Sequence, residues 1–264
     1  MRLLVSTLLL LTPLFIVAQV INTEKLRLDK KDSGWLGDLG LNFGLTRNKA
    51  GQTVALGTNG RVEHIQTQQS WLLFGAYNLS QFLDVDDSEA VPKNFTNNGF
   101  GHLRYNRRIN PLITWEAFVQ GQYDEIQEIE HRYLLGTGPR FRIVEHDSLQ
   151  LYFGTLYMFE DEASNETTSL NGEEIERTVF HHDHRLSAYA SIGWRIRDAV
   201  VINHVTYFQP RLDLWNDYRI SSESSLSVQL STKLRFNAYF QLVYDTQPPN
   251  SVPNTMFVLR NGLS

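Results

Sequence analysis

One short segment of the chain groups residue types that can bind metal ions. The segment FHHDHR places His181, His182, Asp183 and His184 side by side. Imidazole and carboxylate groups together can bind Zn²⁺ or Cu²⁺. Neighbouring residues of an extended segment point in opposite directions, however, and no second pair of ligands is evident. We therefore predict no metal site and no cofactor, and expect a polar outer loop that leads into a strand.

A second grouping could hydrolyse lipid, because some outer-membrane barrels are lipid hydrolases with a serine and a histidine on the outer wall. His204 follows Asn203 on a predicted strand, and Ser187 and Ser191 lie on a neighbouring one. His204 could act as a general base, but serine is common in the chain and no serine is marked as the nucleophile. We therefore expect that the protein is not an enzyme, with an outer-membrane lipid-modifying enzyme as an alternative.

Charged residues of both signs recur on the polar side of the predicted strands. If they face an enclosed space, they could line a selective pore, or they could pair with one another and fill it. Barrels of about eight strands enclose almost no space and barrels of about 16 strands enclose a channel, so an intermediate barrel permits both outcomes. The predicted lumen-facing residues are Asp38, Arg104, Glu116, Asp124, Glu160, Arg185, Arg195, Arg219, Glu223 and Arg235.

The elements that would position these residues are strands, because apolar residues recur at every second position. In GWLGDLGLNFGLT, which begins at Gly34, the residues Leu39, Leu41 and Phe43 alternate with small or polar residues. A period of two predicts a strand with two unlike faces. The pattern predicts strands over residues 34–46, 53–66, 70–80, 98–107, 112–124, 131–143, 149–160, 184–197, 199–209, 218–231, 233–245 and 255–264.

Long predicted connections alternate with short ones. The long ones are residues 47–52, 81–97, 125–130, 161–183, 210–217 and 246–254, and the short ones are residues 67–69, 108–111, 144–148, 197–198 and 232. Short periplasmic turns, longer outer loops and an even number of strands are typical of an outer-membrane barrel. We therefore predict an all-β fold, an antiparallel up-and-down transmembrane β-barrel of about 12 strands.

Aromatic residues on the apolar faces form two groups, one near each end of the predicted strands. They are Trp35, Trp71, Tyr105, Trp115 and Trp194 near the tight turns, and Tyr77, Tyr123, Tyr157, Phe159, Tyr207 and Tyr244 near the long loops. Aromatic side chains favour the membrane–water interface, so these groups predict two aromatic girdles. A soluble lipid-binding barrel, in which the same rings would form a core, is the alternative.

The N-terminal segment differs from the rest of the chain. MRLLVSTLLLLTPLFIVA contains one arginine, an apolar stretch and a small residue at its end, which is the pattern of a signal peptide. We predict a signal peptide over residues 1–18, a short lead-in over residues 19–32 and a single barrel domain over residues 33–264. The protein is then exported to the bacterial outer membrane. No later apolar stretch of about 18 residues predicts a transmembrane helix.

Composition narrows the classes of function. The 264 residues carry a net charge of −5 and include no cysteine, which excludes disulfides and thiol catalysis. No basic block of the kind that nucleic acid would need is present. The expected partners are outer-membrane lipid and lipopolysaccharide, together with the barrel-insertion machinery. The sequence does not indicate an oligomeric state.

The middle of the chain resembles a known family. The segments TWEAFVQGQYDE, RYLLGTGPRFR, HDSLQLYFGTLYMFE and RLSAYASIGWRI are similar, strand by strand, to the bacterial DUF481 family of salt-induced outer-membrane proteins. The similarity extends over roughly residues 40–264. It implies an outer-membrane β-barrel and assigns no reaction or functional residue. We expect a porin-like barrel of unknown substrate, either a small passive channel or a structural component of the envelope.

Overall fold

The computed structural model describes residues 33–264 except residues 50, 85–90, 171–172 and 198. The predicted signal peptide and lead-in lie outside the described residues. The described residues form one sheet of 12 strands, in which each strand pairs antiparallel with the next one in the chain. This arrangement confirms the predicted all-β, up-and-down architecture. The described part of the chain contains no helix that is long and apolar enough to cross a membrane.

The observed strands lie close to the predicted segments. They are β1 (Gly34–Asn48), β2 (Gly51–Ile65), β3 (Gln69–Leu83), β4 (Lys93–Arg108), β5 (Ile113–Asp124), β6 (Ile129–Glu145), β7 (Leu149–Leu170), β8 (Glu173–Ile196), β9 (Val200–Pro210), β10 (Tyr218–Ser231), β11 (Leu234–Asp245) and β12 (Thr255–Leu263).

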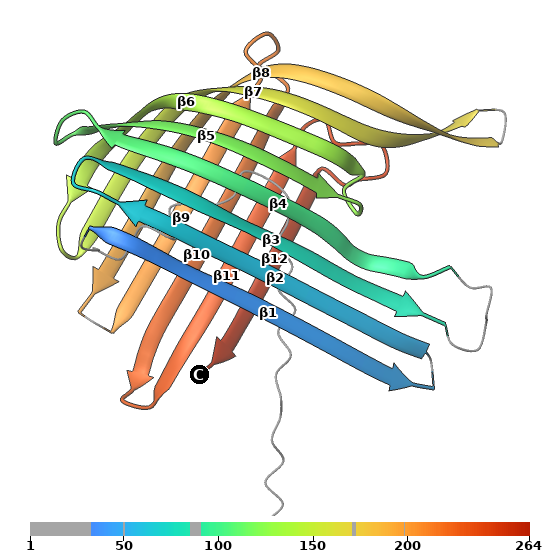
Figure 1. Cartoon of the computed structure of the whole chain (residues 1–264), viewed down its shortest axis with the longest axis horizontal. Helices are drawn as coiled ribbons and strands as arrows, with labels where there is room; N and C mark the ends of the chain where they lie inside the picture. The colour runs from blue at the N-terminus through green and yellow to red at the C-terminus, as the bar shows by residue number, and fades with distance from the viewer. Residues whose placement is uncertain (1–32, 50, 85–90, 171–172, 198) are drawn as a thin grey trace, which may run out of the picture.

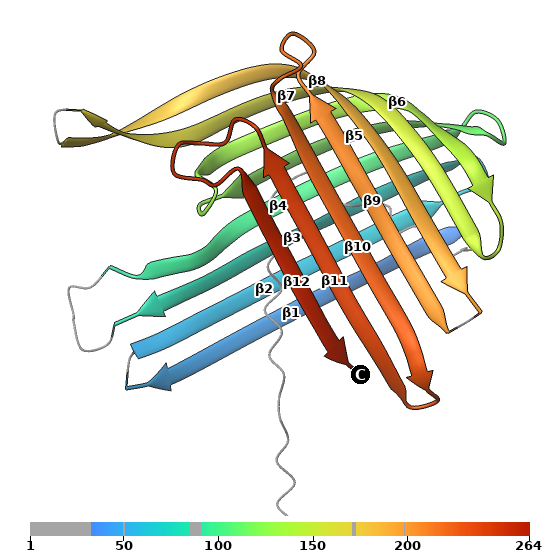
Figure 2. The same ribbon diagram turned by 180° about the vertical axis from the view of Figure 1, so that it is seen from behind.

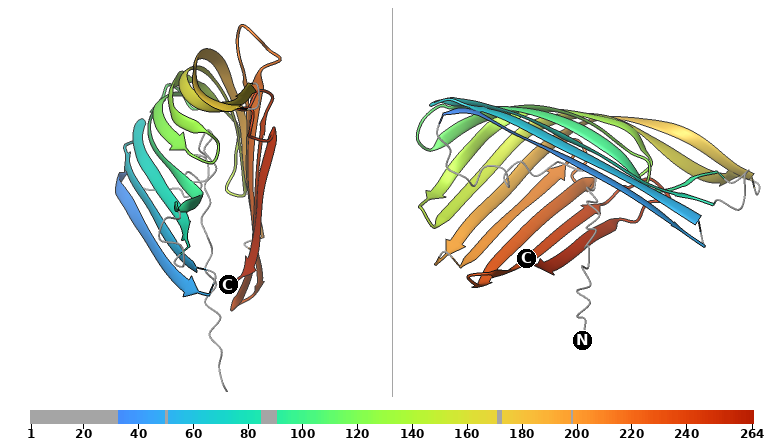
Figure 3. Two further views of the ribbon diagram at one scale, coloured as in Figure 1. Left: turned by 90° about the vertical axis from the view of Figure 1, so that its right-hand side faces the viewer. Right: turned by 60° about the horizontal axis from the view of Figure 1, so that its bottom comes forward.

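The sheet curls round so that its two halves face each other. Strands β1–β6 form one wall, β9–β12 form the other, and β7 and β8 lie at the bend between them (Figure 1, Figure 2). Figure 3 shows the two walls joined along one side and separated along the other. Among the described residues no ladder joins β1 to β12, so the barrel has an open seam between these two strands. Side chains on both faces of β1 are exposed there.

Alternation of burial along the strands separates an inner face from an outer face. On β5, Glu116 and Phe118 are 0% and 4% exposed, whereas Trp115 and Val119, which flank them, are 44% and 47% exposed. Successive side chains of a strand point to opposite faces, so every second residue enters the interior. The outer face is the more apolar one on most strands, which is the arrangement of a membrane barrel rather than of a soluble one.

Two predicted connections are shorter than expected, because part of each is strand. Residues 161–183 were predicted to be a loop, but the β7–β8 ladder continues through them, from Glu160 opposite Asp183 to Leu170 opposite Glu173. Strand β4 likewise begins at Lys93, inside the predicted connection 81–97. Both stretches carry polar residues on both faces, so the period of two is hidden. The histidine-rich segment around His182 therefore lies within a strand.

The open seam generates a test of barrel closure, because an unpaired strand edge does not occur in the hydrocarbon of a bilayer. Antiparallel pairing with Arg260 opposite Asn42 would pair all nine residues of β12 with β1. It would also keep Phe257 and Leu259 beside Leu45 and Phe43 on the outer face. We expect Asn42→Cys with Arg260→Cys to form a disulfide in the membrane-inserted protein, which is measured by gel mobility without reductant.

The chain has no native cysteine to interfere with this measurement. Asn42→Cys with Asn203→Cys is the control that should not link. Asn42→Cys combined with Val258→Cys or with Gly262→Cys tests pairing registers that are shifted by two residues. Failure of all three pairs to link in folded protein would contradict closure at this seam.

The two faces of β1 predict opposite effects for one substitution. Leu41→Arg places a charge on the outer face and should cost about 2–4 kcal/mol at the bilayer midplane. Asn42→Arg faces the interior and should be tolerated. The measurement is the fraction of protein that assembles in membranes and migrates differently when boiled and unboiled. Equal assembly of both variants would show that the faces are assigned wrongly.

Candidate functional site

The interior faces of β4–β11 bring charged side chains together out of contact with solvent. Arg104 and Arg185 are 1% and 2% exposed, and Glu116 and Glu160 are 0% and 1% exposed. Charged residues are almost never this buried unless they are paired. The pairs divide into two groups, one nearer the long loops and one nearer the short turns.

The outer-end cluster lies nearer the long loops. It contains four arginines and five carboxylates: Arg132, Arg185, Arg211, Arg219, Glu160, Glu162, Asp183, Asp217 and Asp245. Glu160 is at its centre, because its carboxylate lies 3.1 Å from Nε of Arg185, 3.5 Å from Nε of Arg132 and in contact with Arg219.

The two most central arginines each bind several carboxylates. Arg185 donates from Nη2 to Asp183 over 2.9 Å and from Nη1 to Asp217 over 3.1 Å. Arg219 donates from Nε to Asp245 over 2.6 Å and from Nη2 to Glu162 over 3.2 Å. The guanidinium group has five donors in a fixed plane, which suits this shared binding of carboxylates.

These pairs connect strands that are not neighbours in the sheet. Arg219 on β10 reaches Glu160 and Glu162 on β7, although β8 and β9 separate the two strands in the ladder order. The outer-end cluster therefore crosses the interior at the bend. Removing one partner of a buried pair leaves an uncompensated charge and costs about 3–5 kcal/mol. Each residue of the outer-end cluster thus restricts where the others can lie.

The turn-end cluster consists of Arg104, Glu116, Arg140 and Tyr189. Both arginines lie 3.5 Å from the Glu116 carboxylate. The hydroxyl of Tyr189 on β8 donates to Oε2 of Glu116 on β5 over 2.7 Å. This bond also crosses the interior between strands that do not pair in the sheet. Arg104 lies over the ring of Phe118, 5.5 Å from its centroid, which adds a cation–π contact.

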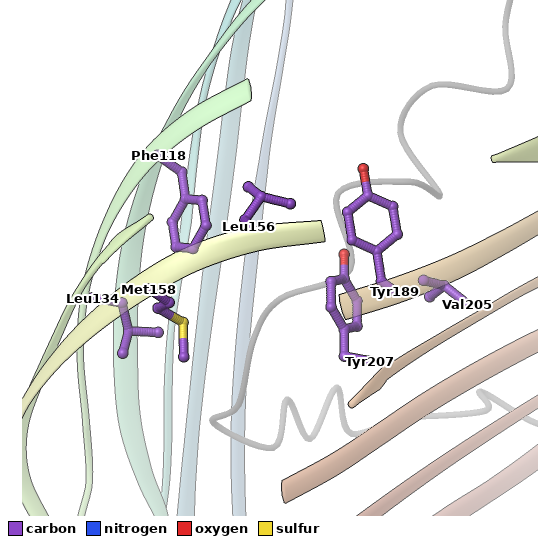
Figure 4. Close-up of a cluster of buried hydrophobic side chains, with 7 residues drawn as sticks. All are labelled: Phe118, Leu134, Leu156, Met158, Tyr189, Val205 and Tyr207. Atoms are coloured by element: carbon purple, nitrogen blue, oxygen red, sulfur yellow. The ribbon is translucent and has the colours of Figure 1, made fainter. Parts of the chain in front are cut away.

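An apolar belt fills the interior beside these two clusters. Its residues are Phe118, Leu134, Leu156, Met158, Tyr189, Val205 and Tyr207 (Figure 4). Figure 4 shows Phe118, Leu134, Leu156 and Met158 on one side of the belt and Tyr189, Val205 and Tyr207 on the other. Glycines make room for the rings: a Cβ on Gly136 would lie 2.3 Å from the Phe118 ring, and one on Gly154 would lie 2.1 Å from the Tyr189 ring. The side chains of the belt therefore pack closely against one another.

Two cavities lie toward opposite ends of the strands. A cavity of about 220 Å³ is lined by the β2–β3 turn, Asn106, Arg108 and Arg140, at the short-turn end. A cavity of about 410 Å³ is lined by Asn97, Tyr123 and residues of the β5–β6 connection, at the long-loop end. The two share no lining residue.

The β9–β10 loop joins the outer-end cluster through Arg211. Its Nη2 donates to Asp213 over 2.7 Å and its Nη1 donates to Asp217 over 3.3 Å. The hydrogen bond from Arg211 holds the pKa of the Asp213 carboxyl below its ordinary value, and the same bond raises the pKa of Arg211. Because Asp217 also binds Arg185, the loop is attached to the buried charges below it.

The structure places the predicted lumen-facing residues in four different settings. Arg104, Glu116, Glu160, Arg185 and Arg219 belong to the two clusters described above. Asp124 is buried but caps the β5–β6 turn, where its Oδ1 accepts from the backbone of Ile126 and Gln127. Glu223 is half-buried on the interior face of β10. Asp38, Arg195 and Arg235 are exposed near the seam or the turns and are not brought together.

Sequence reasoning missed several members of the clusters. Glu162 and Asp183 fall in the stretch predicted as a loop, and Asp217 lies in a true loop. Arg132 and Arg140 lie on β6, where irregular register at Ile129/His131 and Arg142/Val144 obscures the period of two. The sequence did contain one usable signal. Carboxylates on β5 and β7 need positively charged partners, so arginines were to be expected on β6, the strand between them.

The predicted girdle residues lie on the outer face with one exception. Trp35, Trp71, Trp115, Tyr157 and Trp194 are 43–73% exposed, and Tyr77, Tyr105, Tyr123, Phe159 and Tyr244 are half-buried. The girdles themselves stay predictions. Tyr207 was assigned wrongly: it is 2% exposed and packs inside against Tyr189, with ring centroids 5.1 Å apart. The interior has its own apolar belt, so an apolar residue on β9 does not identify the outer face.

The histidines do not form a metal centre in the described residues. His182 binds Asp161 over 2.8 Å, and His184 binds the Tyr157 hydroxyl over 2.6 Å, both across the β7–β8 ladder. Ser187 and Ser191 face the interior and are buried, away from His204 on the outer face. His204 instead lies beside Ser224, with Nδ1 and Oγ 2.8 Å apart. The sequence did not single out this serine.

Comparison with known proteins supports the family resemblance. The family model described as "Protein of unknown function, DUF481" matches residues 39–263. No curated protein matches the chain. The NanC porin in a rhombohedral crystal form is similar with a TM-score of 0.45 and 12% identity, over 85% of this chain and 98% of that chain. The translocator domain of the autotransporter NalP from Neisseria meningitidis is similar with a TM-score of 0.46 and 10% identity, over 90% of each chain.

The close approach of Gly154 to Tyr189 generates a test of the interior packing. Gly154→Ala forces the Tyr189 ring away and breaks its bond to Glu116, so it should destabilise the protein by about 1–3 kcal/mol. Gly101→Ala is the matched control, because nothing lies within 4 Å of a Cβ there. The measurement is the urea midpoint of unfolding in detergent. Equal midpoints for the two variants would contradict a packed interior.

Proposed function

The chain belongs to the DUF481 family of proteins of unknown function, and we propose that it is a structural component of the bacterial outer membrane whose interior is filled by paired charges. The observation that carries this proposal is the buried outer-end cluster. A selective pore needs charged groups that contact passing ions. Here Glu160 and Arg185 are almost fully buried and contact each other instead.

A small passive channel is the other function expected for such a barrel. The belt around Tyr189 and Tyr207 argues against a wide path between β4 and β9. We assign the interior no catalytic role, because its carboxylates are held by arginines. A soluble lipid-binding barrel is disfavoured, since side chains such as Leu73 and Leu135 are 54% and 56% exposed on the outer face. Large apolar surfaces of this kind call for lipid.

The outer face suggests the partners of the protein. Its apolar side chains would contact outer-membrane lipid, and the aromatic girdles would lie at the two interfaces. The acidic residues of the long loops could reach lipopolysaccharide through divalent cations. Assembly in the membrane would require the barrel-insertion machinery.

A second candidate function is lipid modification on the outer wall. The observation that favours it is the 2.8 Å approach of His204 to Ser224, which supplies the nucleophile that the sequence left undefined. This function does not depend on the interior.

The proposed structural role predicts low conductance in planar bilayers. The wild-type protein should insert without a stable open state, because the outer-end cluster blocks the path. Replacing both Arg185 and Arg219 by alanine should produce openings, since five carboxylates each lose at least one arginine partner and repel one another more strongly. Arg142→Ala is the control, because its pair with Glu145 lies at the exposed turn end. A steady wild-type conductance that increases in proportion to salt would support the channel instead.

A further inference from the structure

Four polar side chains form a hydrogen-bonded group on the outer face of β9 and β10. We define the wall cluster as His204, Thr206, Ser222 and Ser224. Nδ1 of His204 lies 2.8 Å from Oγ of Ser224, and Nε2 lies 3.0 Å from Oγ1 of Thr206. Oγ1 of Thr206 is in turn 3.0 Å from Oγ of Ser222. The four groups therefore form one continuous chain of hydrogen bonds.

The wall cluster faces outward, because the residues that alternate with its members along β9 and β10 face inward. Val205 and Tyr207 on β9 and Ser221 on β10 are 1%, 2% and 7% exposed. In the ladders His204 lies opposite Ile192 of β8, and Ser224 lies opposite Phe240 of β11. The cluster is therefore a small polar patch on a largely apolar outer face. Polar groups at such positions are expensive in a membrane and are a functional-site hypothesis by default.

The wall cluster lies close to one of the predicted aromatic girdles. Trp194 is opposite Ile202 in the β8–β9 ladder, and His204 follows two residues later, about 7 Å along the strand. His204 lies near the middle of β9 and Ser224 near the middle of β10. A lipid acyl chain that lies along the wall would therefore contact the cluster.

We propose that the wall cluster is a hydrolytic site for the acyl esters of membrane glycerolipids, with Ser224 as nucleophile and His204 as general base. The order of the hydrogen bonds supports these roles. If Ser224 donates to Nδ1, then the proton of His204 is on Nε2 and is donated to Thr206. Thr206 then donates to Ser222, and the Ser222 hydroxyl is left to donate to a substrate oxygen.

The reaction needs no group beyond these side chains, the lipid and water. Oγ of Ser224 attacks the ester carbonyl carbon while its proton passes to Nδ1 of His204. The tetrahedral intermediate collapses, the bond to the lipid alcohol breaks, and that oxygen takes the proton from Nδ1. Water then attacks the acyl-serine, gives a proton to His204, and releases the fatty acid. The final proton transfer from His204 restores the Ser224 hydroxyl.

Two features set the expected rate of this site. Thr206 binds Nε2 of His204 as a neutral acceptor, where Ser-His-Asp enzymes use a carboxylate, so it stabilises the imidazolium less. Ser222 offers one hydroxyl to the developing oxyanion, where other hydrolases use several donors. Turnover should therefore be slow. Thr206 is a positioning residue, because it acts through His204.

The first test is covalent labelling of the full-length protein in outer-membrane vesicles with a fluorophosphonate, followed by peptide mass spectrometry. The label should be found on Ser224, and His204→Ala should reduce it at least about 100-fold. Ser225→Ala is the matched control: Ser225 is the next residue, faces inward and binds Asn203. Absence of labelling in the wild type, or labelling that survives His204→Ala, overturns the proposal.

The second test is the release of fatty acid from phospholipid by protein refolded into vesicles. Ser224→Ala should abolish the release and Ser225→Ala should not change it. Heat-modifiable migration confirms that each variant is folded. Thr206→Val should narrow the range of pH in which release occurs, and Thr206→Ser should restore it, which a purely structural role would not produce. Equal release by Ser224→Ala and wild type contradicts the proposal, whatever the conductance of the barrel.

Discussion

The pairing of buried charges across the bend of the sheet is the constraint on which the rest of the structure depends. Glu160 on β7 is held by arginines from β6, β8 and β10, and it is 1% exposed. None of these charges could be buried alone, because the cost of removing one from water is several kcal/mol. The interior is therefore compact where the pairs are dense, at β7 and β8. Toward β1 and β12, where pairs are few, the two walls separate.

The strands and their order could be predicted from the sequence because each depends on local alternation. The faces of β5 followed directly from Trp115 and Val119 alternating with Glu116 and Gln120. The contacts inside could not be predicted in the same way. They depend on which strands approach across the interior, on irregular register in β6, and on an apolar belt that makes Tyr207 look like an outer residue. Ser224 was missed because its partner lies on another strand.

The two faces of the barrel therefore have different characters. The interior combines paired charges with the packed rings of Phe118 and Tyr189, and its members restrain one another. The outer wall is apolar over much of its area, and the wall cluster interrupts it with four linked polar groups. A barrel with a filled interior can still act on its surroundings through its wall. The interior face of the strands would then stabilise the barrel, and the outer face of the same strands would carry the proposed reaction.

The most direct test of the filled interior is the accessibility of a single cysteine at Ser187, which is 2% exposed between the two charged clusters. A membrane-impermeant maleimide is added to the folded protein in vesicles, and Asp147→Cys in the exposed β6–β7 turn serves as the reactive reference. We predict that the cysteine at position 187 reacts only after unfolding. Labelling of the folded protein at the rate of the reference would show that water and solutes pass through the interior, and would contradict the account.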